Sequence, residues 1–180
     1  IGADNFMDLS EYKKQMWVKK EEPIFIKKVD LPKNSIGWLV IDSMGFGSST
    51  GGIRIGKNVS LEEVKLLAKE MTLKYTFYNL PIGGAKAGIY CPSPLNMREK
   101  EEIFLTFGKS LKPLLRNRIY SAGPDMGTNQ NDIDQLYKGA GIIVKHVRDT
   151  LDSSYYTAIS VFSALRAISL FNGMKLKGAR

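Results

Sequence analysis

Cysteine and histidine are almost missing from this sequence, and each shortage argues against a class of site. Cys91 is the single cysteine, so an internal disulfide is excluded and no cysteine cluster is available for zinc. His146 is the single histidine, which argues against a metal site built from histidines. It falls near the end of an expected helix, where a structural role at the negative pole of the helix dipole is the simpler interpretation. We therefore predict no metal site.

Long apolar runs and clustered charge are missing as well. No run approaches the roughly 20 apolar residues that a membrane-spanning helix needs, and the first residues do not resemble a secretory signal. We expect a cytoplasmic protein without a membrane partner. The net charge is +8, from 26 Lys and Arg against 18 Asp and Glu, but the basic residues are scattered and form no basic-aromatic module. This pattern argues against a nucleic-acid partner.

The chain is long enough to bury a substantial core. Its 180 residues, with 43% hydrophobic and 24% charged residues, are typical of a globular domain, with room for the first element of a second domain. We expect one domain over residues 1–152 and a connecting helix over residues 153–180.

Alternating strand and helix patterns predict an α/β fold with a mixed sheet of about five strands and helices on its faces. Ser60 with Glu63, and Asn96 with Glu99, have the spacing of capping boxes at two helix starts. Pro113 is expected to end or kink the second of these helices. Strands are expected over 24–29, 36–43, 52–59, 89–91 and 118–121, and helices over 4–20, from 61, from 97, over about 133–147 and over 155–171.

Two lysines in the stretch 71–89 have contrasting surroundings. Lys86 is enclosed by glycines and alanines in 83–88, which we interpret as a turn leading into a short strand. Such an apolar setting disfavours the ammonium form and lowers the pKa of a lysine, which makes a base near neutral pH. Lys74 lies on the flank of a helical apolar stripe, where spacing alone leaves open whether it snorkels at the core's edge or binds a ligand.

The segment 45–52 has the form G-x-G-x-x-T and follows a strand, as a dinucleotide fingerprint does. We reject that match because the fingerprint requires a helix to begin at once, whereas 52–59 has the pattern of a strand and turn. The segment is then either a flexible loop or a loop that contacts an anion or substrate.

Asp125 stands at a strand end between two turn signals, where an aspartate is most often a turn or cap residue. Together with Lys74 and Lys86, and with Gly52 and Arg54 nearby in the chain, it forms a candidate constellation. Two lysines and a carboxylate in a glycine-lined cleft can bind an anionic small molecule and move protons. A Schiff-base role for Lys86 is the competing interpretation.

Four motifs in this order carry a specific resemblance: Gly-Gly-Ile-Arg at 51–54, Met-Thr-Leu-Lys at 71–74, Leu-Pro-Ile-Gly-Gly-Ala-Lys-Ala-Gly at 80–88 and Gly-Pro-Asp-Met-Gly-Thr at 123–128. From residue 36 onward the sequence resembles the N-terminal substrate-binding and dimerisation domain of the Glu/Leu/Phe/Val dehydrogenase family. The resemblance implies a three-layer α/β/α domain in residues 1–152. It also implies a homo-oligomer and a small-molecule substrate, an L-amino acid or the matching 2-oxo acid.

The resemblance also implies roles for individual residues. Lys74 would hold the α-carboxylate, Lys86 would activate water against an imine, and Asp125 would exchange protons with the amino nitrogen. Thr157 stands at the entry to the helix that joins the two domains in the family, although Ser160 replaces a glycine that is common there. The remaining substrate-binding positions implied are Thr50, Gly51, Gly52 and Gly123.

Two departures from the family pattern matter. Glutamate-specific members have a lysine before Gly-Gly-Ile-Arg, whereas this sequence has Thr50, which predicts a substrate other than glutamate. The chain also ends at Arg180, where the family's cofactor domain would begin, so NAD or NADP is expected to bind mainly to a domain absent from this chain. The alternative is a stand-alone, non-catalytic module for dimerisation or amino-acid binding.

Overall fold

The computed structural model describes residues 22–143 and 153–173 of the chain. The chain divides into two compact units, residues 1–144 and 145–180, and each is described by itself. The helix expected over residues 4–20 and His146 lie outside the described residues.

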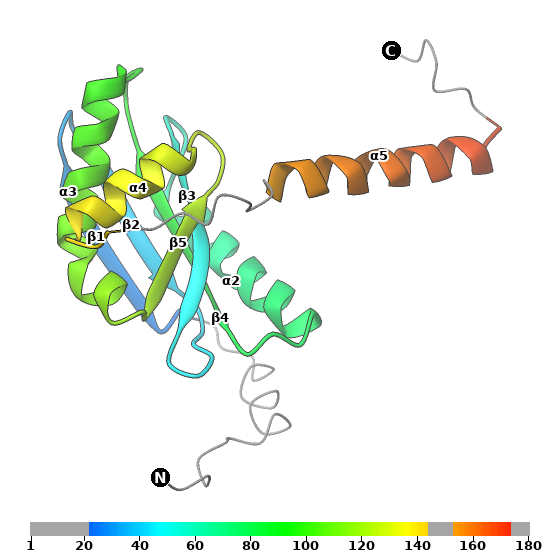
Figure 1. Cartoon of the computed structure of the whole chain (residues 1–180), viewed down its shortest axis with the longest axis horizontal. Coiled ribbons are helices and arrows are strands. Elements are labelled where there is room, and N and C mark those ends of the chain that lie inside the picture. The colour runs from blue at the N-terminus through cyan, green and yellow to red at the C-terminus, as the bar shows by residue number, and fades with distance from the viewer. Residues whose placement is uncertain (1–21, 144–152, 174–180) are drawn as a thin grey trace, which may run out of the picture. The chain divides into compact units, whose positions relative to one another are not determined.

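A five-stranded mixed sheet forms the centre of the first unit (Figure 1). The strand order is β1-β2-β4-β3-β5. β2 pairs antiparallel with both β1 and β4, and β3 pairs parallel with both β4 and β5. The strands are β1 (Phe25–Leu31), β2 (Ser35–Ile41), β3 (Ser49–Gly56), β4 (Gly83–Tyr90) and β5 (Tyr120–Pro124).

Helices cover both faces of this sheet, which gives two apolar cores. α2 (Leu61–Phe77) packs on one face, where its Val64 and Ala68 meet Val40 of β2. α3 (Met97–Arg116) and α4 (Gln130–Gly139) pack on the other face, over the larger core (Figure 1). Side chains alternate along a strand, so β2 contributes to both cores, with Leu39 and Ile41 in the larger one and Val40 in the smaller one. The three-layer α/β/α architecture that the sequence predicts is confirmed.

α3 shows how local sequence sets an element. Asn96 and Glu99 form the expected capping box, in which each side chain accepts a hydrogen bond from the other's backbone N–H at 3.0 Å. The helix then runs through Pro113 to Arg116, so of the two expected effects of Pro113 the structure excludes a helix end at this residue. The fully buried side of α3 carries Ile103, Phe104, Phe107 and Leu111.

β4 is the largest difference from the sequence-based expectation. The glycine-rich stretch that we interpreted as a turn is a strand from Gly83 to Tyr90, and all of its residues except the last are buried. A Cβ atom at Gly84 would overlap the backbone of Thr72, and one at Gly88 would overlap the side chain of Val64. Glycine is therefore needed here for close packing of α2 rather than for turning the chain.

The last helices differ in how well the pattern predicted them. α4 ends at Gly139 and is capped by Ala140, well before the expected end near 147, and Ile143 is 90% exposed. α5 (Ser153–Phe171) forms the second unit's helix as expected. The apolar side chains of α5 that were expected to point inward are 50–57% exposed: Val161, Leu165 and Ile168. In the described part of the chain, no helix combines the length and apolarity that crossing a membrane requires.

Two glycine-to-alanine substitutions test the packing of α2 on β4. Gly84→Ala places a Cβ against the Thr72 backbone and should lower the free energy of unfolding by about 1–3 kcal/mol. Gly123→Ala is the matched control, because a Cβ there meets nothing within 4 Å. It should leave stability within about 1 kcal/mol of the unsubstituted chain, on the stabilising side. Urea unfolding of both variants measures the difference, and equal stabilities would contradict this account of β4.

Candidate functional site

Lys86 lies in the middle of β4 on the face that α2 covers. Its neighbours Ala85 and Ala87 point into the core under α3 and α4, so alternation directs Lys86 to the opposite face. The side chain is only 7% exposed, and its Nζ lies 2.6 Å from Oδ2 of Asp125. The structure thus brings together the two residues that the sequence suggested for proton transfer. The surroundings of Lys86 thus combine the glycine and alanine neighbours of β4 with one carboxylate.

Arg54 on β3 is the second cation on Asp125. Its Nε lies 3.1 Å from the same Oδ2, and its Nη1 lies 2.6 Å from Oε1 of Glu63 on α2. The Ser60 hydroxyl caps α2 as expected by accepting the Glu63 N–H at 3.2 Å. The Glu63 side chain, however, pairs with Arg54, which corrects the expected capping box. Sequence reasoning missed Glu63 as a site residue because its spacing from Ser60 indicated a cap.

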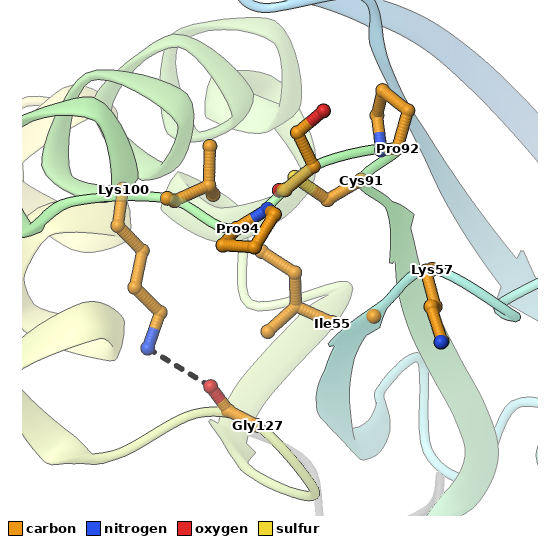
Figure 2. A pocket seen from close by; sticks show the side chains of 10 residues that line it. Ile55, Lys57, Cys91, Pro92, Pro94, Lys100 and Gly127 are labelled. Carbon is orange, nitrogen blue, oxygen red and sulfur yellow. Dashed lines mark hydrogen bonds between the residues drawn. The ribbon is translucent and has the colours of Figure 1, made fainter.

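The loop after β5 is held in place by several hydrogen bonds, and these fix the position of Asp125. The Asp125 N–H donates to the Thr128 hydroxyl at 2.7 Å, and that hydroxyl lies 2.9 Å from the carbonyl oxygen of Ile53. Farther along the loop, Lys100 of α3 donates to the carbonyl of Gly127 at 2.9 Å (Figure 2). A carboxylate presented by a loop is thereby anchored to the sheet and to a helix.

The surroundings of Asp125 decide its charge. Burial of the carboxyl group opposes ionisation, but the hydrogen bond and charge of Lys86, the Met126 N–H and the charge of Arg54 outweigh it. The pKa of Asp125 is therefore held below its ordinary value of 3.8. At neutral pH the group is a carboxylate, which can accept a proton from a bound molecule.

Glycines beside the ion pair keep the sheet surface open. Gly52 of β3 pairs with Gly123 of β5. A Cβ at Gly52 would lie 2.9 Å from Cβ of Asp125, so only glycine lets Asp125 come this close. At Gly123 a Cβ would meet nothing within 4 Å, which leaves space next to Asp125. The neighbouring Gly51 packs against the carbonyl of Ala85, so the structure gives it a packing role.

Thr50 lies at the start of β3 and is tied to two other elements. Its hydroxyl donates to the Ser121 carbonyl on β5 at 2.9 Å and also hydrogen-bonds the Tyr75 phenol on α2. Burial raises the pKa of the Tyr75 phenol, more than the bond to Thr50 lowers it. Thr50 therefore presents a neutral hydroxyl where a lysine would bring a charge.

Lys74 is exposed on α2. It follows Glu63 by about three helical turns, so both residues lie on one face of α2. Glu63 reaches β3 from that face, which puts Lys74 on the side of α2 that overlooks β3, without direct contact to Lys86 or Asp125 among the described interactions. Thr157 lies on α5 in the second unit and is described apart from this site.

Two hollows in the described part of the first unit lie away from this ion pair. One has a volume of about 380 Å³, and its lining includes Cys91, Lys57 and Lys100 (Figure 2). Lys100 is already occupied there, since it also contacts Asp132 at 2.7 Å. The other has a volume of about 440 Å³ and is lined in part by Arg116 and Arg118. Neither hollow is lined by Lys86 or Asp125. The candidate site is therefore defined by the ion pair of these two residues and by the open space at Gly123.

The segment 45–52 does not form a dinucleotide fingerprint. Gly45 and Ser48 form an isolated antiparallel bridge, and β3 begins at Ser49, so a strand follows where the fingerprint needs a helix. The predicted strand is present, but it begins three residues earlier than expected, inside the segment, and runs from Ser49 to Gly56. The described residues do not fit a nicotinamide dinucleotide at this position, nor do they include a group of three or more His, Cys, Asp or Glu side chains that could hold a metal ion.

Comparisons with known proteins agree with this fold. The chain is 39% identical over 94 residues to the NAD-specific glutamate dehydrogenase of Peptoniphilus asaccharolyticus, covering 52% of this chain and 22% of that protein. It is 34% identical over 110 residues to the NADP(+)-dependent glutamate dehydrogenase of Pyrobaculum calidifontis, covering 58% of this chain and 26% of that protein. The chain thus spans about a quarter of the length of these relatives.

The fold is also similar to solved structures. The hetero-hexameric glutamate dehydrogenase of Thermus thermophilus in its Leu-bound form superposes with a TM-score of 0.67 at 24% identity, covering 88% of this chain and 43% of that one. The family described as Glu/Leu/Phe/Val dehydrogenase, dimerisation domain, matches residues 27–140, which include all five strands except the start of β1. The chain therefore belongs to the Glu/Leu/Phe/Val dehydrogenase family and contains its dimerisation domain.

Proposed function

We propose that this chain is the substrate-binding part of an NAD(P)-dependent L-amino acid dehydrogenase, which converts an amino acid reversibly to a 2-oxo acid and ammonia. The observation that carries the proposal is the contact of 2.6 Å between Lys86 and Asp125 beside the open surface at Gly123. A nearly buried amine and an ionised carboxylate in contact, next to space for a small molecule, suit proton transfer to and from a bound substrate.

Each residue has a distinct task in this proposal. Oxidation of the amino acid, with the cofactor held elsewhere in the longer protein, leaves an imine that water must attack. Lys86 first passes its proton to Asp125 across their contact, and the neutral amine then takes a proton from the water as its oxygen bonds to the imine carbon. Asp125 gives its proton to the nitrogen. As the C–N bond breaks, ammonia leaves, the hydroxyl proton returns to Asp125 and the carbonyl group of the 2-oxo acid forms. The direct contact between Lys86 and Asp125 gives a path for a proton between them. The reverse reaction uses the same steps backward.

Substrate binding is assigned to the surface around this pair. Lys74 binds the α-carboxylate with its ammonium, since it is the cation on the side of α2 that overlooks β3 and is exposed enough to meet a ligand. Gly123 lets the substrate lie close to the sheet, Gly52 lets Asp125 approach it, and Gly51 supports the site by its close packing on Ala85. Thr157 of α5 is proposed as a substrate-binding residue of the full-length protein, as the family resemblance implies.

The preferred substrate has an uncharged side chain. Thr50 is neutral, and its hydroxyl is already bonded to Ser121 and Tyr75. A glutamate side chain would find no cation at this position to compensate its desolvation. The curated relatives named above are glutamate dehydrogenases, so Thr50 is the specific reason to expect a different preference here.

The remaining parts of the activity are proposed to reside in a longer protein. NAD or NADP would bind mainly outside these 180 residues, which agrees with the quarter of the relatives' length that the chain spans. Residues 1–152 would form the substrate-binding and dimerisation domain, and residues 153–180 would lead toward the cofactor domain. Self-association of the chain follows from the family's description as a dimerisation domain.

Replacing Lys86 tests the catalytic role. In the full-length protein, Lys86→Ala should lower kcat by about 100- to 10,000-fold, because the proton-transfer group is lost. Lys69→Ala, on the exposed side of α2, is the matched control and should retain full activity. Steady-state kinetics with circular dichroism as a check of folding measure both. Unchanged turnover in a folded Lys86→Ala protein would favour the alternative, a non-catalytic dimerisation or amino-acid-binding module.

Adding the missing charge tests the specificity. The full-length protein should turn over leucine or phenylalanine with a higher kcat/KM than glutamate. Thr50→Lys should raise the ratio of glutamate to leucine kcat/KM by about tenfold or more, since a charge-assisted hydrogen bond becomes possible. Thr50→Val, which removes the hydroxyl without adding charge, is the control. A wild-type preference for glutamate would refute this assignment of Thr50.

A further inference from the structure

Arg54 joins three elements of the first unit that carry separate parts of the site. It extends from β3, its Nη1 contacts Glu63 on α2, and its Nε contacts Asp125 in the loop after β5. Lys86 of β4 contacts the same carboxylate oxygen of Asp125. The charged groups that meet Asp125 are therefore Lys86 and Arg54, with Glu63 behind Arg54, and the Met126 N–H adds a backbone donor.

The partial burial of this network separates it from ordinary surface ion pairs. The side chains of Arg54, Asp125 and Glu63 are 20%, 22% and 34% exposed. By contrast, Glu62 of the same helix is 77% exposed in its contact with Lys65. Exposed pairs of that kind contribute little, whereas several partly desolvated charges with short contacts hold a defined geometry.

Arginine suits a position between two carboxylates better than lysine does. Its planar guanidinium presents donors in fixed directions, so Nε and Nη1 can bind different partners at once without competing. A lysine ammonium is a single point charge on a flexible stem and does not fix two partners relative to each other. The contacts of 2.6 and 3.1 Å in two directions use this property of Arg54.

We propose that Arg54 is a positioning residue that ties α2, through Glu63, to Asp125, and so sets the distance between the substrate-binding and the proton-transferring side of the site. The inference rests on the proposed function for the role of Lys74 on α2. Because Lys74 and Glu63 share a face of one rigid helix, fixing Glu63 also fixes where Lys74 stands relative to Asp125. Arg54 acts through Asp125 and Glu63 and need not touch the substrate.

The position of Glu63 in α2 supports a purpose beyond helix capping. The Ser60 hydroxyl already binds the Glu63 backbone, so the start of the helix is satisfied without the Glu63 side chain. Its carboxylate is directed to β3 instead of returning to the cap. Two restraints act on the Asp125 loop. Thr128 holds Asp125 within the loop itself, whereas Arg54 connects Asp125 to Glu63 of α2.

Three variants separate positioning from simple stabilisation of the fold. Glu63→Gln weakens the link to α2 but leaves Arg54 and its charge beside Asp125. Arg54→Lys keeps a cation near Asp125 but loses the two-way geometry. Arg54→Met removes both. Glu62→Gln, one residue away on α2, is the matched control for loss of an exposed carboxylate.

Carboxyl NMR titration of Asp125 in the 180-residue chain gives the first measurement. Removing a cation that favours the carboxylate raises the pKa, so Arg54→Met should raise the pKa of Asp125 relative to wild type. Arg54→Lys should raise it less, and Glu62→Gln should leave it unchanged. An unchanged Asp125 titration in a folded Arg54→Met chain would overturn the contact with Arg54, whatever the enzyme does.

Kinetics of the full-length protein give the second measurement. Glu63→Gln and Arg54→Lys should each lower kcat/KM for the amino acid by about ten- to a hundredfold with a folded protein, much of it as a raised KM, because the carboxylate-binding side is displaced. Glu62→Gln should match wild type. If both variants lose only thermal stability and keep wild-type kcat and KM, the link is structural and the proposal is wrong.

The two proposals fail in different ways. A full-length wild-type protein that oxidises no amino acid would refute the proposed function, while the Asp125 titration would still report on Arg54. An active wild type whose kinetics are indifferent to Glu63→Gln and Arg54→Lys would refute only the positioning role.

Discussion

The close approach of α2 to β4 is the constraint on which the rest of this structure depends. It exists because Gly84 and Gly88 have no side chains, so the helix packs directly on the central strand. Lys86 lies between these glycines, nearly buried, and contacts Asp125. The same approach places Glu63 within reach of Arg54. The packing of α2 on β4 therefore also determines where the charged side chains of the site meet.

Much of this could be predicted because it is encoded locally. Caps and apolar periodicity gave the helices, and their alternation with strands gave the three layers. Lys86 could be selected from its glycine and alanine neighbours, and the motifs that resemble the family suggested catalytic roles for Lys86 and Asp125, whose contact the structure then shows. These signals depend on residues that are close in sequence or on the order of motifs along the chain, and one sequence contains both in full.

The remaining features depend on contacts between distant segments. The strand at β4 was hidden because glycine and alanine have low strand propensity, and only the packing of Thr72 and Val64 explains them. Glu63 had the spacing of a capping residue, and nothing local indicated that Arg54 would draw its side chain away. α4 ends early at Gly139 although apolar residues continue beyond it. For β4 and Glu63, tertiary structure selected among locally acceptable alternatives, whereas α4 is ended locally by Gly141, whose φ is 71°.

Lys86 lies in β4, which pairs with β2 on one side and β3 on the other. Its position therefore also affects the register in which these strands pair. In β4 the pairing of Lys86 with Val40 of β2 fixes which residues face α2. A shift of one residue would turn the ammonium toward Phe104 and Phe107, into a core with no described counter-charge. Such burial costs on the order of several kcal/mol. Lys86 therefore raises the free energy of a sheet in which β4 is shifted by one residue. Replacing Lys86 with an apolar residue would remove this energetic preference for the correct register.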